Sequence, residues 1–217
     1  VNINAPIEDI RLAIDGQPGI SNQDITSIGG YTTIPVEARQ IGADEKRWQF
    51  YAIRAADDQY LQETEATFKL IADGYGPTEK EVWNALQQDS NLVVVDALVV
   101  PFRDGFGDGE IPFELEGVFY EDTEMEAIDI EIRDPGTGLV IPLKVIGVMD
   151  QFSDAFGELG VGMIASRHEL DDALPTRIPT TTYRFKAAEG VDVSELSMGL
   201  ESAFQENGME SDVLSEL

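Results

Sequence analysis

The single histidine is the first candidate for chemistry, because the 217-residue chain contains one His and no Cys. His168 opens the run His168-Glu-Leu-Asp-Asp172, which has Asp where the zinc-protease pattern H-E-x-x-H has its second His. With one His and no Cys, a zinc ion would need carboxylates for nearly all of its ligands, which is an uncommon set. A Ser-His-Asp triad would also depend on His168, at about the second position of a short predicted helix. We expect an ordinary exposed His there, and an absence of catalytic residues, cofactors and resident metal from the chain.

Three acidic residues in a glycine-rich loop could supply oxygen ligands to Ca²⁺. They are Asp104, Asp108 and Glu110, and their spacing differs from that of an EF-hand, which places acids at positions 1, 3 and 5 and Glu at 12. A solvated acidic turn is the expectation, and these three residues are the only metal candidates that the sequence offers. Adjacent carboxylates such as Asp57-Asp58 are expected by chance among 42 acids, so they carry no specific signal for glycosidase chemistry.

The glycine-rich run at residues 157–162 resembles a nucleotide-binding loop only in composition. It lies between predicted extended segments and does not open a helix, whereas Rossmann and P-loop sites require that context. The sequence also contains no G-x-S-x-G elbow, which disfavours an α/β-hydrolase. We therefore predict no nucleotide cofactor.

Four phenylalanines stand apart from the other aromatic residues because they lie in loops rich in Gly and Asp. Aromatic residues on predicted strands and helices, Trp48, Phe50 and Trp83 among them, are expected to pack in the core. Apolar side chains on loops can instead mark a surface that binds a partner. The partner-binding candidates are Phe102, Phe106, Phe152 and Phe156.

Charge limits the classes of partner. The chain has 42 Asp and Glu against 14 Lys and Arg, which gives a formal net charge of −28. Such a surface repels phosphate backbones and anionic lipid head groups, so we expect no nucleic acid as a partner. The 42% of hydrophobic residues is enough for a folded core, and apolar runs of about 18 residues that could span a bilayer are absent. Because the chain begins with Val1 and not Met, we expect it to be an excised or processed piece.

Helices and strands that could position these residues follow from periodicity and capping patterns. Helical spacing and capping boxes predict helices at about 6–15, 78–88, 166–174 and 192–206. Alternating or β-branched runs predict strands at 34–39, 48–54, 91–96, 113–118, 128–133, 143–149 and 181–186. The predicted fold class is α+β, with strands outnumbering helices.

Several segments occur in an order that resembles the large extracytoplasmic domain of MacB/FtsX-type ABC transporter permeases. The segments are Ala52–Leu61, Phe68-Lys-Leu-Ile-Ala-Asp-Gly74, Val93-Val-Val-Asp96, Leu143-Lys-Val-Ile-Gly-Val148, Met163–Leu170 and the closing stretch Tyr183–Phe204. The resemblance extends from about residue 7 to 206. The chain departs from the family pattern in a longer acidic region around 104–134, which leaves the shape and the partner of that region open.

This resemblance implies a fold with two parts. A porter-like α/β subdomain would be built from residues 1–56 and 176–217, and an inserted, mostly β subdomain of the Sabre type would comprise residues 57–175. The family has no catalytic residues in this domain, so none are assigned here, and the chain is expected not to be an enzyme.

The resemblance also implies a location and a set of partners. The domain would lie on the extracytoplasmic side of the cell membrane, attached to transmembrane helices of the same permease and coupled through them to a cytoplasmic ATP-binding subunit. An extracytoplasmic protein partner and a homodimer of the full transporter are further expectations. Two other hypotheses remain: a freestanding secreted binding or adhesion domain, Ca²⁺-dependent through Asp104, Asp108 and Glu110, and a hydrolase that uses a carboxylate pair.

Overall fold

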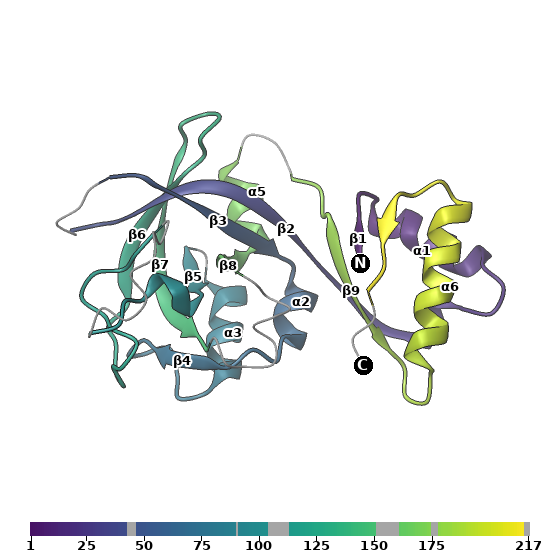
Figure 1. Cartoon of the computed structure of the whole chain (residues 1–217), viewed down its shortest axis with the longest axis horizontal. Helices are drawn as coiled ribbons and strands as arrows, with labels where there is room; N and C mark the ends of the chain where they lie inside the picture. Colours follow the sequence, from purple (N-terminus) through teal and green to yellow (C-terminus); the bar gives the residue numbers. More distant parts are fainter. Residues whose placement is uncertain (43–46, 90, 104–112, 151–160, 175–177, 215–217) are drawn as a thin grey trace. The chain divides into compact units, whose positions relative to one another are not determined.

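The computed structural model describes residues 1–42, 47–89, 91–103, 113–150, 161–174 and 178–214 (Figure 1). The chain divides into two compact units. Unit 1 comprises residues 1–32 and 177–217, and unit 2 comprises residues 33–176. Residues 33–56, which the resemblance implies to belong with the two chain ends, thus fall in unit 2. The assignment of the units to porter-like and Sabre-like subdomains stays a prediction.

Unit 1 is an antiparallel sheet with two helices. Its strands are β1 (Asn2–Ile3), the first part of β2 (Ile25–Gln40), β9 (Thr182–Ala187) and β10 (Ser211–Asp212), in the order β10-β1-β9-β2. Asn2 pairs with both Asp212 and Thr182, so β1 lies between the two C-terminal strands.

The helices of unit 1 are α1 (Ile7–Gly16) and α6 (Val193–Glu206). Ile10 and Ile14 of α1 share one buried cluster with Leu196, Leu200 and Phe204 of α6, as the helical spacing of these apolar residues predicts. The Asp192 carboxylate caps α6 by accepting hydrogen bonds from the backbone N–H groups of Ser194 and Glu195.

Unit 2 is built around a closed ring of strand pairings. The second part of β2 pairs with β3 (Gln49–Ala56), followed in order by β8 (Met163–Ser166), β5 (Leu92–Val95), β7 (Val140–Met149) and β6 (Ile128–Arg133), which pairs again with β2. The short strand β4 (Phe68–Ile71) adds to β7. Inward-facing residues such as Tyr51, Ile53, Ile130 and Ile132 are buried, which accounts for the alternation in the sequence.

Three helices lie in the part of unit 2 that the structure describes. They are α2 (Asp58–Glu63), α3 (Glu79–Gln88) and α5 (Arg167–Ala173). Helix α3 begins with the predicted capping box, in which the Glu81 carboxylate accepts hydrogen bonds from the backbone N–H (3.2 Å) and the hydroxyl (2.7 Å) of Thr78. The 3₁₀ turns η1 (Asn22–Asp24) and η2 (Ala97–Val99) lie in unit 1 and unit 2 respectively. None of the helices in the described part of the chain has both the length and the apolar character needed to cross a membrane.

Mixed helices and strands confirm the α+β class, but two local predictions were wrong. The segment 113–118 alternates in burial yet forms no strand, because Phe113 and Leu115 fill the core while Leu115 makes a single backbone hydrogen bond to Val99. Helix α5 begins at the predicted place, but Ser166 does not cap it with its side chain, and its buried hydroxyl has no hydrogen-bond partner among the described residues.

Candidate functional site

Most residues that the sequence singled out as sites lie outside the described residues. This applies to Asp104, Asp108 and Glu110, and to Phe106, Phe152 and Phe156. Among the residues that the structure does describe, no group of three or more His, Cys, Asp or Glu side chains is arranged to hold a metal ion. The Ca²⁺ hypothesis and most of the loop-tip hypothesis therefore stay predictions.

Phe102 is the one loop phenylalanine of this group that the structure describes. Its ring is half-buried and packs on the ring of Tyr120, with the two centroids 4.8 Å apart. The Lys69 ammonium lies 5.2 Å from the centre of the same Tyr120 ring. Phe102 is thus part of a small aromatic contact, and its role in binding a partner stays a prediction.

His168 is the second residue of α5, as predicted, and its side chain is exposed. Its Nε2 lies 3.5 Å from a carboxylate oxygen of Asp58, the first residue of α2. The imidazole can form an ion pair with Asp58 only when it is protonated. This exposed contact joins two surface helices of unit 2.

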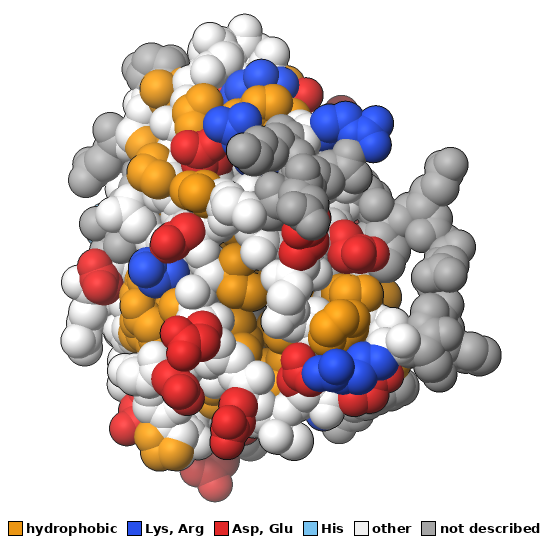
Figure 2. Space-filling model, turned by 90° about the vertical axis from the view of Figure 1, so that its left-hand side faces the viewer, with side chains coloured by type: hydrophobic (Ala, Val, Ile, Leu, Met, Phe, Trp, Pro, Cys, Tyr) orange, Lys and Arg blue, Asp and Glu red, His pale blue; other side chains and the backbone are white. Residues whose placement is uncertain are grey.

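Acidic side chains are spread over the face of the molecule in Figure 2. They lie between hydrophobic and uncharged groups in the middle and lower parts of this view. Acidic residues also occur along the whole sequence, whose net charge is −28. Mutual repulsion among these carboxylates keeps such a surface soluble and disfavours contact with other polyanions.

A buried acid marks the interior of unit 2. Asp96 follows the fully buried strand β5 and is itself 0% exposed. Its carboxylate accepts hydrogen bonds from the Tyr51 hydroxyl, from the backbone N–H of Gly162 (2.7 Å) and from the backbone N–H of Leu98 (2.8 Å). These contacts connect β3, the end of β5 and the residue that precedes β8. Asp96 therefore holds three separate segments of unit 2 together.

Burial is the largest cause of the shifted pKa values of Asp96 and Tyr51. Removal from water raises the pKa of Asp96 above its ordinary value, although the hydrogen bonds from Tyr51, Gly162 and Leu98 lower it in part. Burial also raises the pKa of Tyr51, and the neighbouring Asp96 carboxylate raises it further, so the phenol keeps its proton and donates. In the sequence, Asp96 stands out only as the end of the Val93–Asp96 motif. The signal that could have found it is a lone acid directly after four apolar residues.

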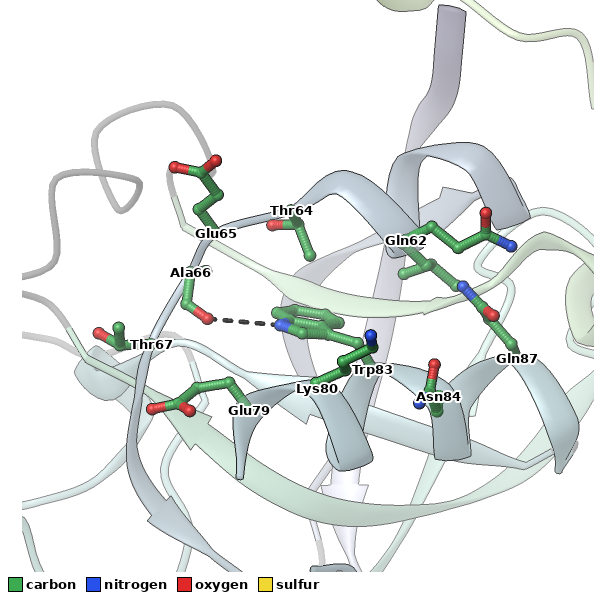
Figure 3. Close-up of a pocket in the computed structure, with 11 residues that line it drawn as sticks. Gln62, Thr64, Glu65, Ala66, Thr67, Glu79, Lys80, Trp83, Asn84 and Gln87 are labelled. Atoms are coloured by element: carbon green, nitrogen blue, oxygen red, sulfur yellow. Dashed lines mark hydrogen bonds between the residues drawn. The ribbon is translucent and has the colours of Figure 1, made fainter. Parts of the chain in front are cut away.

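A polar pocket lies between α2, α3 and the segment that joins α2 to β4 (Figure 3). Its volume is about 810 Å³. Trp83 of α3 forms part of its wall and is 4% exposed, and its indole N–H donates a 3.3 Å hydrogen bond to the carbonyl of Ala66. The Gln87 amide of the same helix donates to the backbone carbonyl of Asp58 in α2. Helix α3 is thus joined to the α2–β4 segment by the first bond and to α2 by the second.

The pocket offers hydrogen-bonding groups of several kinds. Amides, hydroxyls, carboxylates and one ammonium line it, from Gln62, Thr64, Glu65, Thr67, Glu79, Lys80, Asn84 and Gln87. Two carboxylates against one ammonium make the lining slightly acidic. This set of groups can hold a polar segment of a partner by hydrogen bonds. No sequence pattern indicates the pocket, because its residues come from two helices and a linker with no shared motif.

Comparison with known proteins gives likenesses at the level of structure. No family model and no curated protein matches the chain. It is similar to the extracellular domain of the noncanonic ABC-type transporter YknZ from Gram-positive bacteria, at 11% identity and a TM-score of 0.47, covering 96% of this chain and 88% of that one. It is also similar to the periplasmic region of MacB from Actinobacillus actinomycetemcomitans, at 15% identity and a TM-score of 0.47, covering 95% and 76%.

A third similar structure is a domain from Porphyromonas gingivalis of a protein assigned as a permease. The identity is 10% and the TM-score 0.46, and the likeness covers 94% of this chain and 71% of that one. All three structures are domains of transporter or permease proteins.

Proposed function

We propose that this chain is the extracytoplasmic domain of an ABC transporter permease. In this proposal it couples ATP hydrolysis on the cytoplasmic side to conformational change outside the membrane, and it recognises an extracytoplasmic partner or substrate. Its own partners are the transmembrane helices of the same permease, and hydrolysis belongs to a separate cytoplasmic subunit. The chain itself is then not an enzyme.

The first support is the place of the motifs that carry the sequence resemblance. Val93–Asp96 lies on β5 and its end, and Leu143–Val148 lies on β7. Met163–Leu170 is the strand β8 followed by α5, and Tyr183–Phe204 is the strand β9 followed by α6. Each of these four motifs thus coincides with the strand or strand–helix unit that the resemblance implies.

The observation that carries the proposal is that three of these motifs meet at one glycine. Gly147 of the β7 motif pairs with Ile71 of β4 and with Val94 of β5. A Cβ at Gly147 would lie 2.9 Å from two atoms of the Phe68 ring and 3.4 Å from Val94. Phe68 belongs to the second motif and Val94 to the third. Residues that are far apart in the sequence therefore pack closely in unit 2, and the Phe68 ring leaves no room for a side chain at Gly147.

The second support is the arrangement of the two ends in unit 1. Strands β1 and β10 pair antiparallel, with Asn2 opposite Asp212 and Ile3 opposite Ser211. A domain that is inserted between two membrane helices needs its entry and its exit close together. The β1–β10 pairing provides that closeness.

The full-length gene tests the proposal. We expect apolar segments of about 20 residues, long enough to span the membrane, shortly before Val1 and shortly after Leu217. A nearby gene or domain with an ATP-binding fold would complete the expected transporter. A secretory signal peptide with no later apolar span would contradict the proposal and leave the freestanding binding domain as the better description.

A further inference from the structure

One outward face of unit 2 carries charges in an alternating pattern. On β2 and β6, Glu37 lies opposite Arg133, and two residues along, Arg39 lies opposite Glu131. The nearest oxygen–nitrogen distances are 2.5 Å for Arg133–Glu37 and 2.6 Å for Arg39–Glu131. Each strand therefore shows one positive and one negative side chain, in opposite order. We call the four residues the charge checkerboard.

Trp48 lies over the two arginines of the checkerboard. The guanidinium carbon of Arg39 is 4.3 Å from the centre of its ring, and that of Arg133 is 4.5 Å away. The indole is half-buried and not in the core, so the expected core position of Trp48 was wrong. Phe50 differs from its prediction in the same way, because its side chain is 64% exposed. Trp and Arg are the residue types that most often dominate protein–protein contacts.

Apolar side chains continue this face on the neighbouring strands. Phe50 points outward from β3 because Tyr51, its neighbour, points into the core. Val140 lies opposite Arg133 on β7 and is 41% exposed, and Leu139 precedes it in the β6–β7 connection. Blue Lys and Arg side chains lie beside orange hydrophobic ones in the upper part of Figure 2. We call the checkerboard with Trp48, Phe50 and Val140 the neutral face.

The neutral face differs from the rest of the chain in charge. The charges of its two Glu and two Arg residues sum to zero. The charges of the adjacent ion pair Lys144–Asp129, with its atoms 3.1 Å apart, also cancel. The chain as a whole carries −28. Repulsion between two copies is therefore weaker when two such faces approach than when surfaces rich in carboxylates approach, and this favours the orientation in which the neutral faces meet.

We propose that the neutral face binds the same face of a second copy of this chain. A two-fold axis in the interface and parallel to the strands places Arg133 of one copy over Glu37 of the other, and Arg39 over Glu131. An axis across the strands places Glu37 over Arg39. The alternating pattern is therefore complementary to itself in both orientations, which is what an isologous contact requires.

Sedimentation equilibrium of the 217-residue chain tests this proposal. We expect a monomer–dimer equilibrium between ~5 and ~500 μM, the range of transient contacts. Dimers should be tighter at ~500 mM than at ~50 mM salt, because salt screens the long-range repulsion between two chains of −28. A monomer at every concentration and salt level would overturn the proposal.

Two matched variants locate the contact. Phe50→Ser removes an exposed apolar side chain from the neutral face and should weaken the dimer about tenfold or more. Met198→Ser removes a side chain of similar exposure, 60%, from α6 in unit 1 and should leave the dimer unchanged. Dimers that survive Phe50→Ser, or that are lost in Met198→Ser, would place the contact on another surface and overturn the proposal.

A double charge reversal tests the pattern itself. Glu37→Arg with Arg133→Glu keeps the pair within the chain and the net charge, but reverses one row of the checkerboard. This variant is then mixed with the wild type. In a mixed dimer, whichever of the two axes relates the copies, two of the four facing charge pairs have the same sign. We expect mixed dimers to be weaker than wild-type dimers, measured by energy transfer between labelled copies. Equal affinity would contradict the proposed charge pattern.

Discussion

The Tyr51 hydroxyl donates a hydrogen bond to the Asp96 carboxylate inside unit 2, where both side chains are at most 4% exposed. An ionised carboxylate in this position is stabilised by its donors and destabilised by its burial. Because burial is the larger effect, the pKa of Asp96 lies above its ordinary value. This makes the stability of unit 2 depend on pH.

Tyr51→Phe should destabilise unit 2, and more so at pH values where Asp96 is ionised than where it is protonated. The change keeps the ring that packs on Phe113, with centroids 5.6 Å apart, and removes one donor from the carboxylate. We expect a loss of roughly 1.5–3 kcal/mol in the free energy of unfolding at pH values where Asp96 is ionised, the usual range for a hydrogen bond to a charged group. Urea unfolding of both proteins across the pH range measures it.

The sign of the pH effect follows from the raised pKa of Asp96. A group whose pKa is raised on folding contributes stability below its unfolded pKa, near 3.8, and loses that contribution as the pH rises through the folded value. The Tyr51 hydrogen bond lowers the pKa of folded Asp96, so Tyr51→Phe should raise this pKa further. Stability is then lost over a wider range of pH in the variant than in the wild type. Tyr183→Phe, whose hydroxyl donates 2.9 Å to the uncharged carbonyl of Ala5, should cost the same at all pH values. A deficit in Tyr51→Phe that does not change with pH would contradict this account.

Gly147→Ala should be poorly tolerated because three motif segments approach this residue. The new Cβ would overlap the Phe68 ring at 2.9 Å, so we expect a loss of about 1–3 kcal/mol in the free energy of unfolding. Gly16→Ala is the control, since its Cβ would meet nothing within 4 Å. Combined with Phe68→Ala, the Gly147 change should cost much less. Equal costs in both backgrounds would show that the contact with Phe68 is not the cause.

Gly199→Ala tests the packing of unit 1. In an exposed helix this change stabilises by up to about 1 kcal/mol, because Ala is the better helix former. Here the Cβ would lie 2.4 Å from Cγ2 of Ile20, so we expect a lower melting temperature. Ile20→Ala removes that methyl group, and in its background Gly199→Ala should raise the melting temperature. A rise in both backgrounds would contradict the close packing of α6 on Ile20.

Sequence patterns predicted most of the helices and strands, because capping and apolar spacing depend on residues that are near one another in the sequence. The capping box at Thr78–Glu81 and the apolar stripe of α3 depend only on neighbours in the sequence, and the structure confirms them. The segment 113–118 has the same alternation as a strand, but a strand also needs a partner edge. Its backbone instead bonds to the Val99 carbonyl through the Leu115 N–H and to the side chain of Gln40 through Glu116. Periodicity cannot show which edge is available.

The candidate sites could be predicted less well, for the same physical reason. The neutral face depends on the register of β2 against β6, which brings Glu37 and Arg133 together across 96 residues. The polar pocket depends on how α2 and α3 pack. By contrast, the resemblance carried by Phe68, Val94 and Gly147 could be read from the sequence, because each of the three residues lies in a segment that resembles the family pattern. Their mutual contact could not.

The most direct test of the permease proposal uses the absence of Cys from the chain. Met198→Cys, at a position 60% exposed, is introduced into the full-length parent protein in bacterial spheroplasts, with Ala203→Cys, 0% exposed on the same helix, as the control. The measurement is labelling by a membrane-impermeant maleimide, read in membranes after a high-salt wash. We predict that the Met198→Cys protein is labelled without permeabilisation and stays in the membrane, and that the Ala203→Cys protein is not labelled. Labelling of Met198→Cys only after permeabilisation, or loss of the labelled protein in the wash, would contradict the proposal.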